Sequence, residues 1–127
     1  MKHFLLVVAG GAAGSLMRFG IGEWLNPGHG FPLGTFTVNV TGSFALGALL
    51  AALALRGDDT GRRRDVRLLL GTGLLGGYTT YSALAVETQT LLRDDRVALG
   101  LAYVVGSVGI GLIAAGAGLL AGRAAVR

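Results

Sequence analysis

Residues 76–82 (Gly-Gly-Tyr-Thr-Thr-Tyr-Ser) are the part of this chain best suited to chemistry. They lie in the middle of a stretch that is apolar enough to cross a membrane. Two glycines followed by two β-branched threonines form a poor helix centre. In lipid, unwound backbone persists only where protein buries it or where it lines a polar cavity. The segment therefore predicts peptide groups and hydroxyls exposed at mid-membrane, which indicates ion handling rather than anchoring.

The backbone oxygens of this segment are candidate cation ligands. If the helix unwinds here, the carbonyls of Gly76 and Thr79 are free to bind a cation. Ligation by oxygen alone suits a hard ion such as sodium. Tyr78 and Tyr81 lie beside the break, and their partly positive ring edges can face an anion. Packing between helices is the simpler interpretation of both rings, but nothing structural requires the break itself, so we interpret the break as functional.

Polar residues also recur along one face of two other predicted helices. Thr35, Asn39 and Ser43 follow one another at four-residue spacing and so share a face. A buried amide in a membrane must find partners. Asn39 therefore either bonds across helices or donates its NH2 group to a passing anion. Tyr103 and Ser107 form a second stripe, which serves packing alone or completes a polar path with the first.

Few charged or histidine side chains fall within the apolar stretches. Arg18 is the only basic residue inside a predicted span; it either snorkels to the interface or concentrates anions at a pore mouth. Glu87 is interpreted as a capping or pairing residue, with a gating or proton role as the alternative. His3 and His29 are interpreted as interfacial residues. The chain has no cysteine, Ser/His/Asp arrangement, carboxylate pair or phosphate-binding loop, so we do not expect an enzyme.

The composition and the apolar segments predict an all-α membrane protein. Hydrophobic residues make up 52% of the chain and charged residues only 14%, against about 25% charge in soluble domains. A helix needs about 20 apolar residues to span the bilayer. The continuously apolar N-terminus is short for a signal peptide and is soon interrupted by glycines, so we expect it to be an uncleaved first span. We predict one domain over 1–127 with four transmembrane helices, the third broken at mid-membrane, at about 3–25, 33–55, 67–92 and 97–122.

The basic residues are distributed unevenly between the two sides of this topology. Of the 11 Lys and Arg residues, eight fall on the side of the termini. They are Lys2, Arg56, Arg62, Arg63, Arg64, Arg67, Arg123 and Arg127; the other side has Arg18, Arg93 and Arg96. This bias predicts cytoplasmic termini. It also explains the sequence pI near 10.4 without nucleic acid as a partner.

Glycine spacing predicts close contacts between helices. Small residues four apart, as in the pairs Gly10/Gly14, Gly73/Gly77 and Gly118/Gly122, let membrane helices approach closely. Four short helices enclose little interior, so an oligomer in the lipid bilayer is expected.

Taken in order, these elements are similar to those of a known family. The chain resembles the Fluc (CrcB) fluoride channels over essentially its full length. The matching elements are residues 10–14 with Arg18, residues 34–44 around Asn39, residues 76–82 followed by Glu87, and the stripe of Tyr103 and Ser107.

The resemblance implies a passive fluoride channel of the cell membrane that exports fluoride and lowers its toxicity. It implies a dimer of two oppositely oriented subunits with two pores, and one structural sodium ion at the centre. The sodium positions match Gly76 and Thr79. The remaining implied pathway positions are Asn39, Thr35, Thr80, Tyr81, Ser82, Leu84, Tyr103, Ser107 and Arg18.

The chain departs from the family at the pore aromatics. The family lines its pore with two phenylalanines three residues apart, and these positions are Tyr81 and Leu84 here, with Ala83 between in place of a hydroxyl residue. One ring edge is therefore missing. Together with the charge bias, this raises a second hypothesis, in which the chain pairs with a related chain rather than with itself.

Two rival classes remain. A small multidrug-type exporter also has four spans, but it depends on a membrane-embedded carboxylate, and Glu23 and Glu87 lie near span ends. A non-conducting membrane subunit would explain the glycines but not the break.

Overall fold

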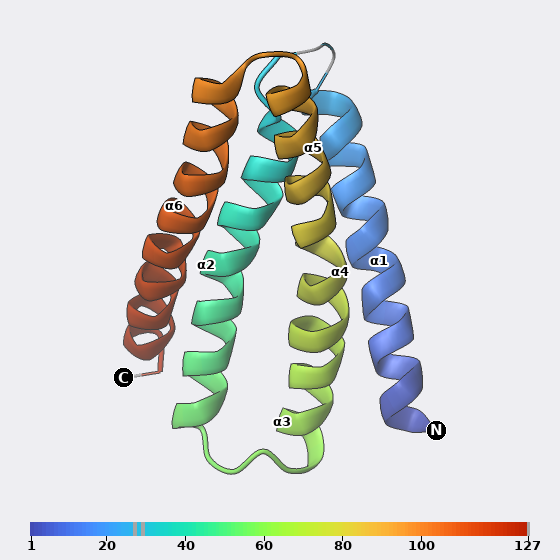
Figure 1. The fold of residues 1–127 in the computed structure, drawn as a ribbon. Helices are drawn as coiled ribbons and strands as arrows, with labels where there is room; N and C mark the ends of the chain where they lie inside the picture. The colour runs from blue at the N-terminus through green and yellow to red at the C-terminus, as the bar shows by residue number, and fades with distance from the viewer. Residues whose placement is uncertain (27, 29, 127) are drawn as a thin grey trace.

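The protein consists of four helical rods that run alternately up and down (Figure 1). The computed structural model describes all residues except 27, 29 and 127. The expected positions of His29 and Arg127 therefore lie outside the described residues. The first, second and fourth rods are single helices, whereas the third rod is built from four consecutive helical segments. No β-strand occurs among the described residues. The elements are α1 (Lys2–Leu25), α2 (Leu33–Leu55), α3 (Gly61–Val66), η1 (Arg67–Leu75), α4 (Gly76–Tyr78), α5 (Tyr81–Arg93) and α6 (Val97–Ala124).

The all-α prediction is confirmed, and so are three apolar spans. Among the described residues, α1, α2 and α6 are each long and apolar enough to cross a membrane. The third predicted span, 67–92, is not one helix. Its rod begins earlier, at Gly61, and its first apolar part, η1, has the wider π-helical hydrogen bonding.

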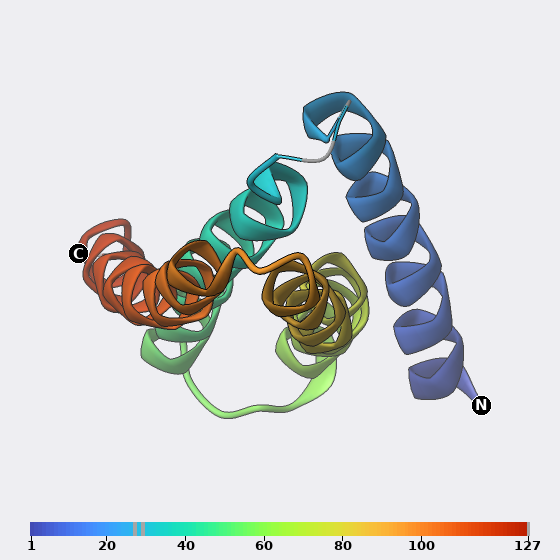
Figure 2. The same ribbon diagram turned by 45° about the horizontal axis from the view of Figure 1, so that its top comes forward.

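The four rods form two closely packed pairs, and the later part of the third rod, α5, packs mainly against α6. Helix α2 packs against α6, and α1 packs against η1 and α4. Figure 2 shows α1 and α6 at opposite sides of the molecule. Buried apolar residues form two small clusters, one around Val38 and Tyr78 and one around Leu84 and Tyr103. Most other large apolar side chains on α1 and α6 face outward, as expected of helices that meet lipid.

The first pair is held at very short range by glycines. A Cβ added to Gly10 or Gly14 of α1 would meet backbone atoms of η1 and α4. A Cβ added to Gly73 or Gly77 would meet the backbone of α1 in turn. The predicted small-residue contact is confirmed for these two glycine pairs. Gly77 itself stays helical, and its missing side chain lets Gly11 approach.

The second pair, α2 and α6, is also held at short range by glycines. A Cβ on Gly118 would meet the backbone of Phe44, and one on Gly122 would meet the backbone of Ala48. Gly47 of α2 faces the backbone of Ala115 in the same way. The α2–α6 contact therefore leaves no room for side chains larger than hydrogen at three positions.

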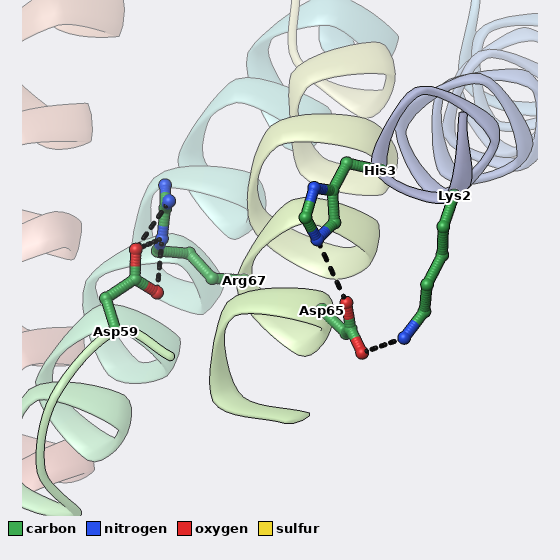
Figure 3. A network of polar contacts seen from close by, with 5 residues as sticks. All are labelled: Lys2, His3, Asp59, Asp65 and Arg67. Carbon is green, nitrogen blue, oxygen red and sulfur yellow. Dashed lines mark hydrogen bonds and ion pairs between the residues drawn. The ribbon is translucent and has the colours of Figure 1, made fainter. Parts of the chain in front are cut away.

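Ion pairs join segments at the end of the molecule that carries the termini (Figure 3). The Asp65 carboxylate lies 2.6 Å from Lys2 Nζ and 3.5 Å from His3 Nε2. Arg67 forms a separate pair with Asp59, with Nη2 2.7 Å from Oδ2 and Nε donating to both carboxylate oxygens. Hydrogen bonds from Arg67 hold the pKa of the Asp59 carboxyl below its usual range. These contacts fix the loop after α2 and the start of the third rod against their neighbours.

Candidate functional site

The third rod is interrupted at Thr79 and Thr80, whose backbones are extended (ψ 158° and 128°). Helix α4 ends at Tyr78, and α5 starts again at Tyr81. The Thr80 hydroxyl accepts from the Ala83 N–H at 3.2 Å, so Thr80 is the N-cap of α5. The sequence predicted the interruption within residues 76–82, and the structure places the extended backbone at the two threonines of that segment.

The side-chain amide of Asn39, on α2, hydrogen-bonds to both the N–H and the C=O of Thr80. Its Nδ2 donates to the Thr80 carbonyl at 2.9 Å, and its Oδ1 accepts from the Thr80 N–H at 2.8 Å. In an unbroken helix the Thr80 N–H would bond to the carbonyl of Gly76. Asn39 therefore bonds across helices, as one of its two interpretations predicted, and its NH2 group retains a second hydrogen for another acceptor.

A groove of about 500 Å³ runs between α2, the interruption and α6. It brings together seven of the predicted site residues from three rods. It is lined by Asn39, Gly42, Ser43, Leu46, Gly76, Thr79, Thr80, Tyr81, Leu84, Ser107, Val108, Gly111, Leu112 and Ala115. None of these lining residues carries a formal charge, so the groove offers amide, hydroxyl and carbonyl groups within apolar walls.

Ser107 carries the least satisfied polar group of this groove. Its side chain is only 5% exposed, and its Oγ has no hydrogen-bond partner among the described residues. Buried hydroxyls nearly always have a partner. Thr80 Oγ1 and Ser82 Oγ lie 3.2 Å apart and form a hydroxyl pair beside the groove. The Ser107 hydroxyl is thus available to something that enters the groove.

The two positions that the resemblance assigns to the pore aromatics, Tyr81 and Leu84, face different surroundings. Leu84 is 6% exposed and packs with Leu91 and Tyr103. Tyr81 also lines the groove but is 83% exposed. The inner of the two positions therefore has an aliphatic side chain in this protein.

Three of the other predicted residues, Arg18, Thr35 and Tyr103, lie around Glu87 rather than in the groove. A second pocket, of about 280 Å³, is lined by Arg18, Thr35 and Glu87, among others. Thr35 Oγ1 donates to Glu87 Oε1 at 2.8 Å, and Tyr103 OH donates to Glu87 Oε2 at 2.6 Å. Arg18 lies at the wall of this pocket, with Nη1 3.4 Å from the Thr79 carbonyl.

The central position of Glu87 was the main feature that the spacing of residues did not reveal. Its partners lie 52 and 16 residues away in the chain. An ionisable side chain in an apolar segment is itself a signal of such a role, and pairing was the interpretation that the sequence favoured. The sequence also did not reveal the contact of Phe31 with Tyr103, whose ring centroids lie 5.2 Å apart.

Gly76 and Thr79 are compatible with a sodium ion. Both line the groove, and Asn39 takes the Thr80 N–H that would otherwise occupy the Gly76 carbonyl. The Thr79 carbonyl accepts a long contact from Arg18. Neutral carbonyl oxygens are suitable ligands for a hard monovalent cation. Two oxygens are too few for a complete shell, so a second chain would have to supply the others.

The rods and the uncharged polar groove define a multi-span helical membrane protein that offers neutral hydrogen-bonding groups between its helices. The model of the family "CrcB-like protein, Camphor Resistance (CrcB)" matches residues 5–119, and this chain belongs to that family. It is 45% identical to a "Fluoride-specific ion channel FluC" of Rhizobium meliloti (strain 1021), over 99% of this chain and 100% of the relative. It is 47% identical to the protein of that name from Paracoccus denitrificans (strain Pd 1222), over 97% of each chain.

Proposed function

We propose that this protein is a passive, fluoride-selective channel that carries fluoride out of the cytoplasm and so lowers its toxicity. Membership of the CrcB family and the names of relatives that cover nearly the whole chain support this proposal. The observation in the structure that carries it is the uncharged polar groove at the interruption of the third rod. A multidrug-type transporter is not favoured, because the relatives that cover nearly the whole chain are named fluoride-specific ion channels.

The groove has the chemistry that a small, strongly hydrated anion needs. Dehydration is the dominant cost for fluoride, and donors in the pore must replace part of the hydration shell. Asn39 has one unused N–H, and Ser107 has an unpartnered hydroxyl. Conduction also requires that the ion can leave, so binding must stay weak. Neutral donors satisfy both requirements, whereas a fixed basic side chain in the groove would hold the ion.

The pocket around Glu87 is proposed as the continuation of the pathway. Arg18 at its wall would raise the local anion concentration. Thr35 and Tyr103 donate to the carboxylate and leave it less able to repel a passing anion. The Ser82 and Thr80 hydroxyls would connect this pocket to the groove, with Tyr81 and Leu84 beside them.

The working unit is proposed to be an antiparallel dimer with two pores in the plasma membrane, with the termini of this chain biased to the cytoplasm. A sodium ion at the dimer centre would be held by the carbonyls of Gly76 and Thr79 from both chains. When bound, it would offset the repulsion between the anions in the two pores. The residues of this chain act by directing their carbonyls at the shared groove and by keeping the interruption open.

A second candidate is a subunit that conducts only when it pairs with a related chain. Two observations favour it over an ordinary homodimer. Of the two positions expected to be pore aromatics, the buried one is Leu84, whose side chain is aliphatic. Eight of the 11 basic residues lie on one side, which opposes the insertion of one sequence in both orientations.

Fluoride efflux from liposomes that contain this chain alone tests the proposal, beside a chloride control. Selective fluoride efflux is expected from the homodimer. Asn39→Asp should abolish that flux, because a carboxylate repels the anion, while Thr37→Ala, on α2 but outside the groove lining, is the matched control. No efflux from a folded preparation would overturn the homodimer and favour the two-chain channel, which co-expression with a related chain would test.

A further inference from the structure

A separate cavity of about 320 Å³ lies at the end of the molecule that carries the termini, away from the proposed pathway. Its walls come from the last turns of α2, the loop after it and the start of the third rod. One wall is apolar, formed by Leu50, Leu53 and Ala54. Two basic residues, Arg63 and Arg67, line the same cavity. No residue of the pathway lines it.

From this cavity we infer a binding site for one anionic phospholipid, with its phosphate on Arg63 and Arg67 and an acyl chain along the end of α2. Basic pockets between membrane helices are suited to anionic headgroups. The planar guanidinium matches phosphate geometry with several donors at once. The inference concerns lipid recognition and does not depend on which ion the protein conducts.

Both arginines keep donors for a ligand. Arg63 uses Nε on the Asp58 carbonyl at 2.8 Å, which leaves its two terminal nitrogens. Arg67 uses Nε and Nη2 on Asp59, which leaves Nη1 (Figure 3). These internal bonds hold both side chains in place, so a phosphate meets donors that are already oriented.

The carboxylate of Asp59 also lines the cavity and opposes an anion there. Two arginines against one aspartate leave the cavity with a net positive charge. Asp59 therefore acts as a built-in competitor for Arg67, and it weakens the site without cancelling it. This gives the inference a test in which a substitution increases binding.

The apolar wall favours a lipid over a free phosphate. Leu50 is 41% exposed and lines the cavity together with the two arginines. It belongs to α2, which is one of the helices suited to cross the membrane. An acyl chain would cover this side chain while the headgroup reaches the guanidinium groups, and inorganic phosphate would gain nothing from it.

Native mass spectrometry of the full chain in neutral detergent tests the site with phosphatidylglycerol and phosphatidylcholine of identical acyl chains. We expect phosphatidylglycerol to be retained more tightly than phosphatidylcholine, by about fivefold for each arginine that contacts its phosphate. Arg63→Gln should lower that preference about fivefold. Asp59→Asn should raise it, and a misfolded protein could not produce a gain. Arg93→Gln, with the same charge change at the far end of the third rod, should leave it unchanged.

Three results would overturn the inference. Equal retention of the two lipids would remove the headgroup preference. A loss in Arg93→Gln as large as that in Arg63→Gln would show a general charge effect. Displacement of phosphatidylglycerol by glycerol phosphate at the same concentration would show a phosphate site without lipid recognition.

Discussion

Replacement of Asn39 by leucine is expected to destabilise the protein by about 2–4 kcal/mol in the free energy of unfolding. The amide satisfies both the N–H and the C=O of Thr80 at 2.8 and 2.9 Å. Leucine fills the space of asparagine but offers neither bond. A buried backbone group left unpaired costs about 1–3 kcal/mol, and hydrogen bonds between membrane helices contribute about 1–2 kcal/mol each in model peptides. Two such groups give the stated range.

Equilibrium unfolding in mixed micelles measures this change, with helix content followed by circular dichroism. Ser43→Ala on the same face of α2 is the control and should remain within about 0.5 kcal/mol of the wild type. Hydrogen exchange at the Thr80 amide should also accelerate, by roughly 30- to 900-fold if the whole change acts there. If Asn39→Leu has the same free energy of unfolding as the wild type, Thr80 has other partners. The pair of hydrogen bonds between Asn39 and the Thr80 backbone, which we call the clamp, would then not stabilise the protein.

Three further substitutions test other parts of the structure. Gly77→Ala places a Cβ against the Gly11 backbone, so a loss of about 1–3 kcal/mol is expected in micelle unfolding; Gly106→Ala, which faces open space, should cost less than about 0.5 kcal/mol, and equal effects would contradict the packing argument. Tyr103→Phe removes the 2.6 Å bond to Glu87 and should cost about 1–3 kcal/mol, whereas an unchanged unfolding midpoint would show that another donor replaces it. Leu84→Phe should speed fluoride efflux from this chain alone about two- to tenfold, for a ring contact of about 0.5–1.5 kcal/mol; equal or slower flux would refute a role for the missing ring.

The sequence predicted the rods well because apolar length is a local property. The second helix was expected at about 33–55 and is Leu33–Leu55, and the first and last agree closely at Lys2–Leu25 and Val97–Ala124. The glycine pairs were also found from spacing alone, since residues four apart share a helix face.

The site was less predictable because tertiary contacts decide it. Low helix propensity predicted a break within residues 76–82, but it did not reveal that Gly77 stays helical and packs against Gly11. The extended backbone falls at Thr80 because Asn39, 41 residues earlier in the chain, satisfies both of its backbone groups. No local pattern reveals such a partner. The π-helical course of η1 gave no sequence signal either.

The clamp between Asn39 and Thr80 also constrains how the protein is made. A ribosome delivers α2 before the third rod, so the amide is already in the membrane when Thr80 arrives with two unpaired backbone groups. Lipid offers those groups no partner. The third rod therefore completes its insertion only against a neighbour that is already in place, and synthesis order becomes part of the folding mechanism. A circular permutant that starts at the 56–60 loop would release the third rod first and would insert poorly, although its finished structure would be the same.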